Sequence, residues 1–220
     1  PGGVPSHDTF NRLFSLLDPA HFHDIFIEWV QDTLVQTELA GVIAVDGKTQ
    51  RGSRRHSAPT SHIVNAWSTE LGICLGQETV NDKSNEITAV PALLEKLAIK
   101  GCLVTADAMS CQKKIASQIV KQQADYLLAV KKNQRSLYNA IDTHFMGYWA
   151  QHPEDSPTDP AFSVMTEAKH HRQEYRRCWV QDASGWPALK SWGAKTVAAI
   201  QYDREVGEKK TSDIRYFVSS

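Results

Sequence analysis

Two aspartates, each at the end of a hydrophobic run, are the residues of this chain best placed to do chemistry. Asp46 follows the run Gly41–Val45, and Asp107 follows Gly101–Ala106. Apolar runs of this length, opened by glycine and rich in β-branched residues, are typical of strands buried on both faces of a sheet. Ligands of open α/β sheets bind at the carboxyl ends of strands, so two carboxylates delivered there from separate strands could hold a divalent cation.

A simpler interpretation is that one or both aspartates cap the turn after a strand, which is the commoner role of an isolated Asp-Gly. The presence of two such acids favours metal chemistry. Because the proposed ligands are hard oxygens, Mg²⁺ or Mn²⁺ is the expected ion. Two ions roughly 3.5 to 4 Å apart would support phosphodiester cleavage by stabilising the attacking and leaving oxygens.

The elements that position these acids can be predicted from the spacing of the apolar residues. The pattern predicts helices at 6–17, at 19–37, from 88 with Pro91 in its first turn, at 111–123 and at 135–149. It predicts strands at 41–46, at 61–69 and 73–80 as a hairpin, at 101–107 and at 125–130. Further alternating runs predict strands at 162–167, 173–181, 195–203 and 214–219, with few tight hairpin turns between them.

This order predicts an α/β fold with a mixed sheet that begins antiparallel, ends in βαβ crossovers and has acids on its first and fourth strands. That is the plan of a ribonuclease-H-like nucleotidyl-transfer domain. We expect a helical lead-in at 1–40, the ribonuclease-H-like catalytic core with flanking helices at 41–150, and a β-rich insertion packed beside it at 151–220. Trp149, Trp179, Trp186 and Trp192 either stack on bases or, more commonly for such residues, belong to the core.

Composition limits the possible partners of this 220-residue chain. Its 24 Lys and Arg balance 25 Asp and Glu, so any contact with nucleic acid must come from local clusters. Four cysteines without a CxxC pair argue against a zinc ribbon or a disulfide framework and suit a reducing cytosol. The sequence shows no signal peptide and no apolar run of transmembrane length, so we expect no membrane partner. Because the chain opens with Pro-Gly-Gly rather than Met, we expect a piece of a longer protein.

Two basic clusters lie beside the predicted acid positions. One follows Asp46 and contains Lys48, Arg51, Arg54 and Arg55. The other follows the strand at 125–130 and contains Lys131, Lys132, Asn133, Gln134 and Arg135. Either cluster could contact DNA phosphates or base edges, and either could instead be a solvated basic loop.

Several motifs together resemble the H-repeat-associated transposases, which are bacterial insertion-sequence enzymes of the DDE type. The motifs are Ser6–Arg12, Val45–Thr49, Arg51–Ser53, Lys83–Ala89, Asp107–Met109, Cys111–Gln112, Lys131 with Asn133–Gln134, and Arg215–Ser220. Ser110 and Lys132 stand where glycine is usual in the family, and His171 and Gln173 depart from a motif that normally reads His-Gly-Arg-Ile-Glu. The resemblance extends from one end of the chain to the other.

The resemblance implies a transposase whose two aspartates and one glutamate hold two Mg²⁺ ions. Asp46 and Asp107 match the first two acids. The third acid is expected on a helix after the β insertion, beyond Ser220, so the chain would be truncated at both ends. Glu174 is the alternative third acid. Its basic neighbourhood would suit a phosphate site, and Arg172 within it is a further candidate DNA contact.

The implied partners are double-stranded DNA, as element ends and target, and a second copy of the chain. The implied location is the cytoplasm of a bacterium, at the nucleoid. The alternative is a decayed, truncated remnant that folds and binds DNA or a partner without catalysis.

Overall fold

The computed structural model describes residues 3–35, 41–49, 62–80, 86–152, 161–169 and 172–220. The helices are α1 (His7–Leu16), α2 (Pro19–Val35), α3 (Glu86–Glu95), α4 (Lys113–Lys121) and α5 (Arg135–Gln151), with short 3-10 turns η2 (Lys132–Gln134) and η3 (Lys190–Trp192). The strands are β1 (Val42–Thr49), β2 (His62–Ser68), β3 (Ile73–Val80), β4 (Leu103–Ala106), β5 (Asp125–Val130), β6 (Phe162–Lys169), β7 (Arg172–Asp182), β8 (Thr196–Val206) and β9 (Lys209–Ser219).

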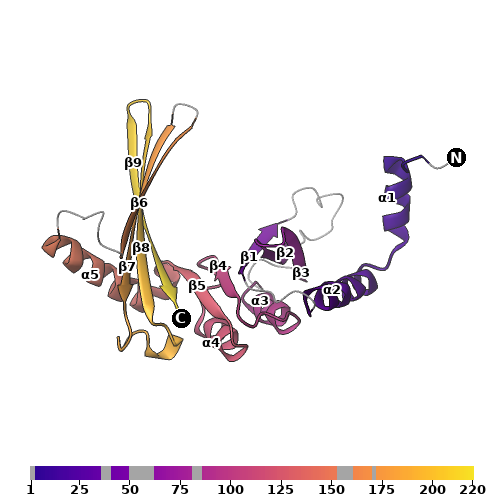
Figure 1. Ribbon diagram of the computed structural model, residues 1–220, viewed down its shortest axis with the longest axis horizontal. Helices are drawn as coiled ribbons and strands as arrows, with labels where there is room; N and C mark the ends of the chain where they lie inside the picture. The colour runs from indigo at the N-terminus through magenta and orange to yellow at the C-terminus, as the bar shows by residue number, and fades with distance from the viewer. Residues whose placement is uncertain (1–2, 36–40, 50–61, 81–85, 153–160, 170–171) are drawn as a thin grey trace.

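The nine strands form one mixed sheet in the order β3-β2-β1-β4-β5-β9-β8-β7-β6. β1, β4 and β5 run parallel, and the remaining neighbours are antiparallel. The predicted hairpin and the two predicted crossovers through α3 and α4 are therefore present. An α/β fold with a large mixed sheet and several helices is confirmed (Figure 1).

The two faces of the central strands are buried to different extents. On one face, Ile43, Val45 and Val104 are buried in the hydrophobic core, to which α3 and α4 also contribute. Helix α4 adds Ile115 and Ile119, both fully buried. Because side chains alternate along a strand, Asp46 falls on the opposite, more accessible face.

Helix α3 begins earlier than predicted, so the expected position of Pro91 in its first turn is wrong. The helix starts at Glu86 and Pro91 is an interior residue. Proline there removes one backbone donor from the helix. The first turn has no apolar stripe, since Ile87 and Thr88 are exposed, and periodicity could not reveal it. The Pro91 carbonyl accepts a hydrogen bond of 2.9 Å from the Gln118 side chain of α4, which ties the two helices together.

Strands β6 to β9 form a long antiparallel ribbon that rises from one end of the core, and α1 lies at the opposite end (Figure 1). The ribbon is continuous with the core because β9 pairs with β5. The scarcity of tight hairpin turns predicted from the sequence is wrong at one place. β8 and β9 are joined by Gly207 and Glu208 alone, and Gly207 has a φ of 58°, which such two-residue turns favour.

The four tryptophans near and within the ribbon are structural. Trp179 and Trp192 are 2% exposed, and Trp149 and Trp186 pack against the hydrophobic core while partly buried. Trp149 and Trp179 meet edge to face, with 5.0 Å between ring centroids. The interpretation of these residues as core is therefore confirmed.

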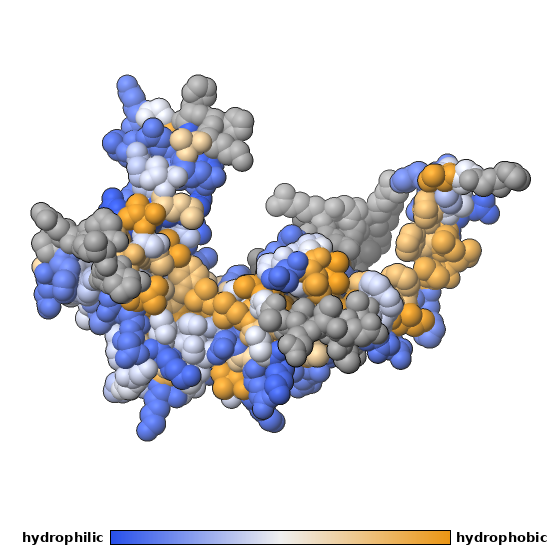
Figure 2. Space-filling view, viewed as in Figure 1, coloured by the Kyte–Doolittle hydropathy of each residue, from blue (hydrophilic) through white to orange (hydrophobic). Residues whose placement is uncertain are grey.

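Helix α1 is amphipathic but buries none of its residues. Ser6 caps it, as the sequence predicts, by accepting a hydrogen bond from the Thr9 amide. Phe10, Leu13 and Phe14 remain exposed and form part of an apolar surface at this end of the molecule (Figure 2). None of the helices in the described ranges is both long enough and apolar enough to cross a membrane.

Candidate metal site

The two predicted acids lie where the parallel pairing of β1 with β4 ends. Asp107 directly follows β4, whereas β1 continues past Asp46 to Thr49 through its pairing with β2, so the predicted end of the first strand at residue 46 is wrong. β1 and β4 pair in register from Val42 with Leu103 to Val45 with Ala106. The next residue on each strand is the aspartate, so Asp46 and Asp107 are neighbours on strands about 4.8 Å apart. Both side chains are exposed. The sheet therefore brings Asp46 and Asp107 together at one accessible edge.

The loop after β4 orients the Asp107 carboxylate. Its Oδ1 accepts hydrogen bonds from the backbone amides of Met109 at 3.0 Å and Ser110 at 3.2 Å. Both bonds fall on one oxygen, and within the described residues Oδ2 takes part in no hydrogen bond or ion pair. The aspartate thus caps its turn and still offers one oxygen to a ligand, so the two interpretations of this residue are compatible.

Asp46 is held less firmly than Asp107. Among the described residues its charged partner is Lys48 on the same strand, with 3.7 Å between Nζ and Oδ2. Both side chains are mostly exposed, so this ion pair is weak and easily displaced. Two hard carboxylate donors, one restrained and one adaptable, suit Mg²⁺ or Mn²⁺. Among the described residues no group of three or more His, Cys, Asp and Glu is arranged to hold a metal ion.

A pocket of about 690 Å³ opens beside Asp107. Its lining combines the ends of β4 and β5 with the middle of β9 and with α5. The charged and aromatic lining residues include Asp107, Lys131, Lys132, Tyr138, Asp213 and Arg215. Three cations and two carboxylates in the lining of one pocket suit a ligand that carries phosphates beside a metal ion.

Arg215, Asp213 and Tyr138 were not selected from the sequence. Arg215 Nε lies 3.0 Å from Asp213 Oδ2, and its guanidinium lies 4.6 Å from the Tyr202 ring centroid. Asp213 and Arg215 lie on β9 and reach the pocket only because β9 pairs with β5, a long-range pairing that no local pattern indicates, whereas Tyr138 comes from α5. The one available signal was the family motif that begins at Arg215.

The predicted DNA-binding residues have different positions. Lys48 is exposed on β1 near Asp46, and Lys131 lines the pocket. Asn133 is exposed, but its side-chain nitrogen donates a 2.6 Å hydrogen bond to the Ala108 carbonyl. Arg172 lies on the ribbon and pairs with Glu174 at 2.9 Å. The remaining three predicted residues, Arg51, Arg54 and Arg55, lie outside the described residues.

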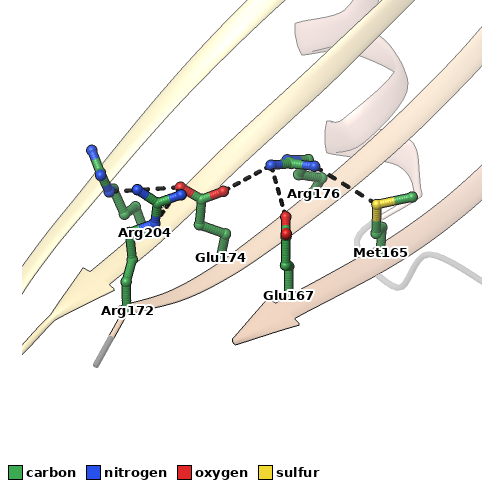
Figure 3. A network of polar contacts seen from close by, with 6 residues as sticks. All are labelled: Met165, Glu167, Arg172, Glu174, Arg176 and Arg204. Atoms are coloured by element: carbon green, nitrogen blue, oxygen red, sulfur yellow. Dashed lines mark hydrogen bonds and ion pairs between the residues drawn. The ribbon is translucent and has the colours of Figure 1, made fainter. Parts of the chain in front are cut away.

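Glu174 is surrounded by arginines (Figure 3). Arg172 and Arg204 approach its Oε1 at 2.9 and 3.6 Å, and Arg176 approaches its Oε2 at 2.8 Å. Arg176 also reaches Glu167 on β6 at 3.2 Å. The Glu174 side chain is only 17% exposed, and the three arginines around it already neutralise the charge of its carboxylate.

Sheet order separates Glu174 from the two aspartates. β7 lies four strands from β4, which is roughly 19 Å across the sheet. The strand registers connect Ala129, the neighbour of Asp107, through Phe217 and Ala198 to Val180. Glu174 lies six residues further along β7, or roughly 20 Å towards the tip of the ribbon. The structure therefore does not bring Glu174 to the candidate metal site.

Cys111, just beyond Asp107, has no place in the chemistry of the site. Burial, and to a smaller extent the charge of Asp107, raises the pKa of its thiol to about 12. The thiol stays protonated near neutral pH and is a poor nucleophile. Cys111 is fully buried and anchors the start of α4 in the core.

Comparison with known proteins shows which family this chain belongs to. Residues 37–183 match the family model described as Transposase DDE domain, a span that begins before β1 and ends after β7. The chain belongs to this family. Asp46 and Asp107 both lie inside the matched span. The transposase assignment made from the sequence motifs is thereby confirmed.

Relatives at higher identity agree with the family. The chain is 38% identical to the "H repeat-associated putative transposase YhhI" of Escherichia coli (strain K12), over 99% of this chain and 58% of that protein. It is 42% identical to the corresponding YbfD protein over 79% of this chain and 67% of that protein.

A protein from Xanthobacter autotrophicus, described as "Uncharacterized protein in dhlA 3'region", is 37% identical over 99% of this chain and 73% of its own length. The chain thus spans little more than half of YhhI and about three quarters of the Xanthobacter protein. A piggyBac transposase chain from a synaptic complex with hairpin DNA has a TM-score of 0.39 and 10% identity over 81% of this chain and 32% of that chain. That likeness is too slight to support an argument.

Proposed function

We propose that this chain is the catalytic part of a DNA transposase with a ribonuclease-H-like core, which cleaves and transfers phosphodiester bonds for an insertion sequence. The observation that carries the proposal is the neighbouring position of Asp46 and Asp107, directly after the last paired residues of the parallel strands β1 and β4. Family membership supports it, since the match includes both acids.

Asp46 and Asp107 are the residues that would hold Mg²⁺ or Mn²⁺, two ions in the complete enzyme. When bound, such ions lower the pKa of water and stabilise charge on the attacking and leaving oxygens. The same site serves water for donor nicking and the freed 3′-hydroxyl for strand transfer, and neither reaction needs a protein nucleophile. Asp107 Oδ1 is occupied by backbone amides, so Oδ2 is the atom we assign to the metal.

The pocket beside Asp107 is the surface we assign to double-stranded DNA. Lys131, Lys132 and Arg215 would place phosphates next to the metal-binding oxygens. Such a protein would act on element ends and target DNA at the nucleoid of a bacterial cell, and its activity would require two copies to bring two ends together.

A second candidate is a chain that folds and binds DNA without catalysis. It is favoured by one observation: the described residues hold no cluster of three acidic or imidazole groups, and Glu174 lies far from the aspartates. Two carboxylates leave most of an octahedral shell to water, so loss of a third should cost several kcal/mol of transition-state stabilisation.

The deciding experiment compares Mn²⁺ binding and Mg²⁺-dependent nicking of element-end DNA. The proteins are this chain, its Asp46→Asn and Asp107→Asn variants, and a fusion that continues into the remaining residues of YhhI. We expect weak Mn²⁺ binding that either substitution abolishes, and strand transfer by the fusion alone. Mn²⁺ binding that is unaffected by both substitutions would disprove the metal site. An inactive fusion that still binds DNA would favour the second candidate.

A further inference from the structure

We propose that Asn133 is a positioning residue that fixes the loop carrying Asp107, with Gln134 as a second tie. This inference rests on the proposed function, because it assigns Asn133 a part in the same metal site. The Asn133 side-chain nitrogen donates a 2.6 Å hydrogen bond to the Ala108 carbonyl, across 25 residues of chain. Ala108 directly follows Asp107.

Gln134, the next residue, makes the second connection between this turn and the Asp107 loop. Gln134 Nε2 donates to the Cys111 carbonyl at 3.0 Å and lies 3.1 Å from Gln112 Oε1. Asn133 and Gln134 both belong to the 3-10 turn η2 that ends β5, so one short turn holds two carbonyls of the loop after β4. β4 and β5 are themselves paired in parallel. The hydrogen bonds from Asn133 and Gln134 connect the two chain segments beyond the ends of these strands.

The loop between Asp107 and Gln112 needs these donors. Ala108 and Ser110 are 5% and 6% exposed, so their polar backbone groups are largely removed from water. A buried carbonyl without a partner is unfavourable, and the chain avoids that state by moving. Without the Asn133 amide, the Ala108 carbonyl would keep only the longer 3.4 Å hydrogen bond from the Cys111 amide of the same loop. The loop would lose its connection to the turn after β5 and could therefore move.

Movement of this loop reaches the metal-binding oxygen directly. The amides of Met109 and Ser110 fix Asp107 Oδ1 and so set the direction of Oδ2. Partners that orient a metal ligand typically change metal affinity by 10- to 100-fold when removed. We expect an effect of about that size for Asn133→Ala.

This role differs from the DNA contact that the sequence predicted for Asn133. Its amide nitrogen is engaged by Ala108, whereas Lys131, two residues earlier, lines the pocket. A DNA contact predicts weaker DNA binding with unchanged metal binding. A positioning role predicts changed metal binding in the absence of any DNA.

The test measures two properties of the whole 220-residue chain without DNA: Mn²⁺ affinity, from the loss of the free-ion EPR signal, and amide hydrogen exchange at Met109 and Ser110 in metal-free protein. We expect Asn133→Ala to weaken Mn²⁺ affinity about 10- to 100-fold and to speed exchange at both amides. Exchange at Leu128 in β5 should stay unchanged, which a general loss of stability would not allow. Gln134→Ala should produce the same pattern.

Asn139→Ala is the matched control, because Asn139 is an exposed asparagine of α5. It should alter neither measurement. If Asn133→Ala leaves both measurements at wild-type values, the positioning role is disproved. If the wild-type chain binds no Mn²⁺, the proposed metal site fails, and exchange at Met109 and Ser110 still decides whether Asn133 holds the loop. If both measurements stay at wild-type values while a separate titration with a DNA duplex shows weaker binding by Asn133→Ala, Asn133 is a DNA contact and this inference is wrong.

Discussion

The Tyr216 hydroxyl donates a 2.8 Å hydrogen bond to Asp142 Oδ1 and so joins β9 to α5. Tyr216 is 1% exposed, and its ring meets that of Tyr138 edge to face at 5.3 Å. Both tyrosines line the pocket beside Asp107. This contact fixes the wall of the candidate DNA surface to the helix behind it.

Tyr216→Phe should lower the free energy of unfolding by about 1 kcal/mol, since it removes a hydrogen bond to a carboxylate that water can partly reach. Urea denaturation at pH 7.5 measures the change. Tyr138→Phe is the control, because within the described residues the Tyr138 hydroxyl makes no hydrogen bond. Equal losses for the two variants would show that the Tyr216–Asp142 bond adds nothing.

Alkaline pH should destabilise the protein through Tyr126 and Tyr216. Burial, first of all, raises the pKa of both hydroxyls above the usual value. Above about pH 10 the unfolded tyrosines ionise while the folded ones keep their protons, so unfolding releases protons and stability falls as pH rises. The loss should approach about 1.4 kcal/mol per pH unit for each tyrosine. Urea midpoints between pH 8 and pH 11 test this, and a Tyr126→Phe, Tyr216→Phe double variant should show a flatter profile.

Glu174→Gln should lower stability without changing metal binding. The substitution leaves Arg172, Arg176 and Arg204 with a neutral partner in a partly buried site, which should cost about 1 kcal/mol. Mn²⁺ affinity should equal that of the wild type, because the sheet keeps Glu174 away from Asp107. A protein whose Mn²⁺ binding or nicking depends on Glu174 would instead make this residue the third acid.

Arg215→Ala and Lys131→Ala should weaken DNA binding to a similar degree for all sequences. Each cation that neutralises a phosphate contributes close to one unit to the slope of log affinity against log salt, so each variant should reduce the slope by about 1. Fluorescence anisotropy with a DNA duplex at several salt concentrations measures this. Lys121→Ala, at the end of α4, is the matched control. An unchanged slope for both pocket variants would remove the pocket from the DNA surface.

Two glycines should respond to alanine in opposite directions. Nothing lies within 4 Å of a methyl group added at Gly147 inside α5, so Gly147→Ala should raise stability by about 0.5 to 1 kcal/mol. A methyl group at Gly76 on β3 would lie 3.2 Å from Leu93 and 3.5 Å from Ile27, so Gly76→Ala should lower stability by about 1 kcal/mol. Thermal unfolding measures both, and stabilisation at Gly76 would show that the packing of α2 and α3 on β3 is looser than the structure indicates.

The positions of Asp46 and Asp107 could be predicted because a hydrophobic run, typical of a buried strand, directly precedes each acid. The local hydrophobic pattern identifies the buried part of each strand, and the acid follows it in chain direction. The pattern missed that β1 continues to Thr49, because residues 47–49 are held by pairing with β2 and not by burial of apolar side chains. The same reasoning could not place Glu174. Its basic neighbours in the sequence suggested a phosphate site, but Arg172 and Arg176 pair with Glu174 itself. The distance from Glu174 to Asp107 depends on the order of nine strands, which no local pattern gives.

Asn133 shows a second limit of local pattern. A polar residue in a basic cluster is a natural DNA contact, and only the structure shows that its amide faces Ala108. Arg215 was missed for the related reason that its neighbours across the sheet are distant in sequence. The tight turn at Gly207 and Glu208 could have been predicted from the sequence, because a glycine between two runs of alternating polar and apolar residues favours a two-residue hairpin turn.

The pairing of β5 with β9 affects how the protein folds during its synthesis. Leu127 pairs with Ser219 and Val130 with Tyr216, so β5 keeps an open edge from its own synthesis until β9 follows. Open strand edges recruit other chains, and contacts this distant in sequence form slowly. The β8–β9 hairpin can form locally around its two-residue turn and then dock on β5 as a unit. Slower translation of residues 131–208 should therefore lengthen the exposure of that edge and increase aggregation of the nascent chain.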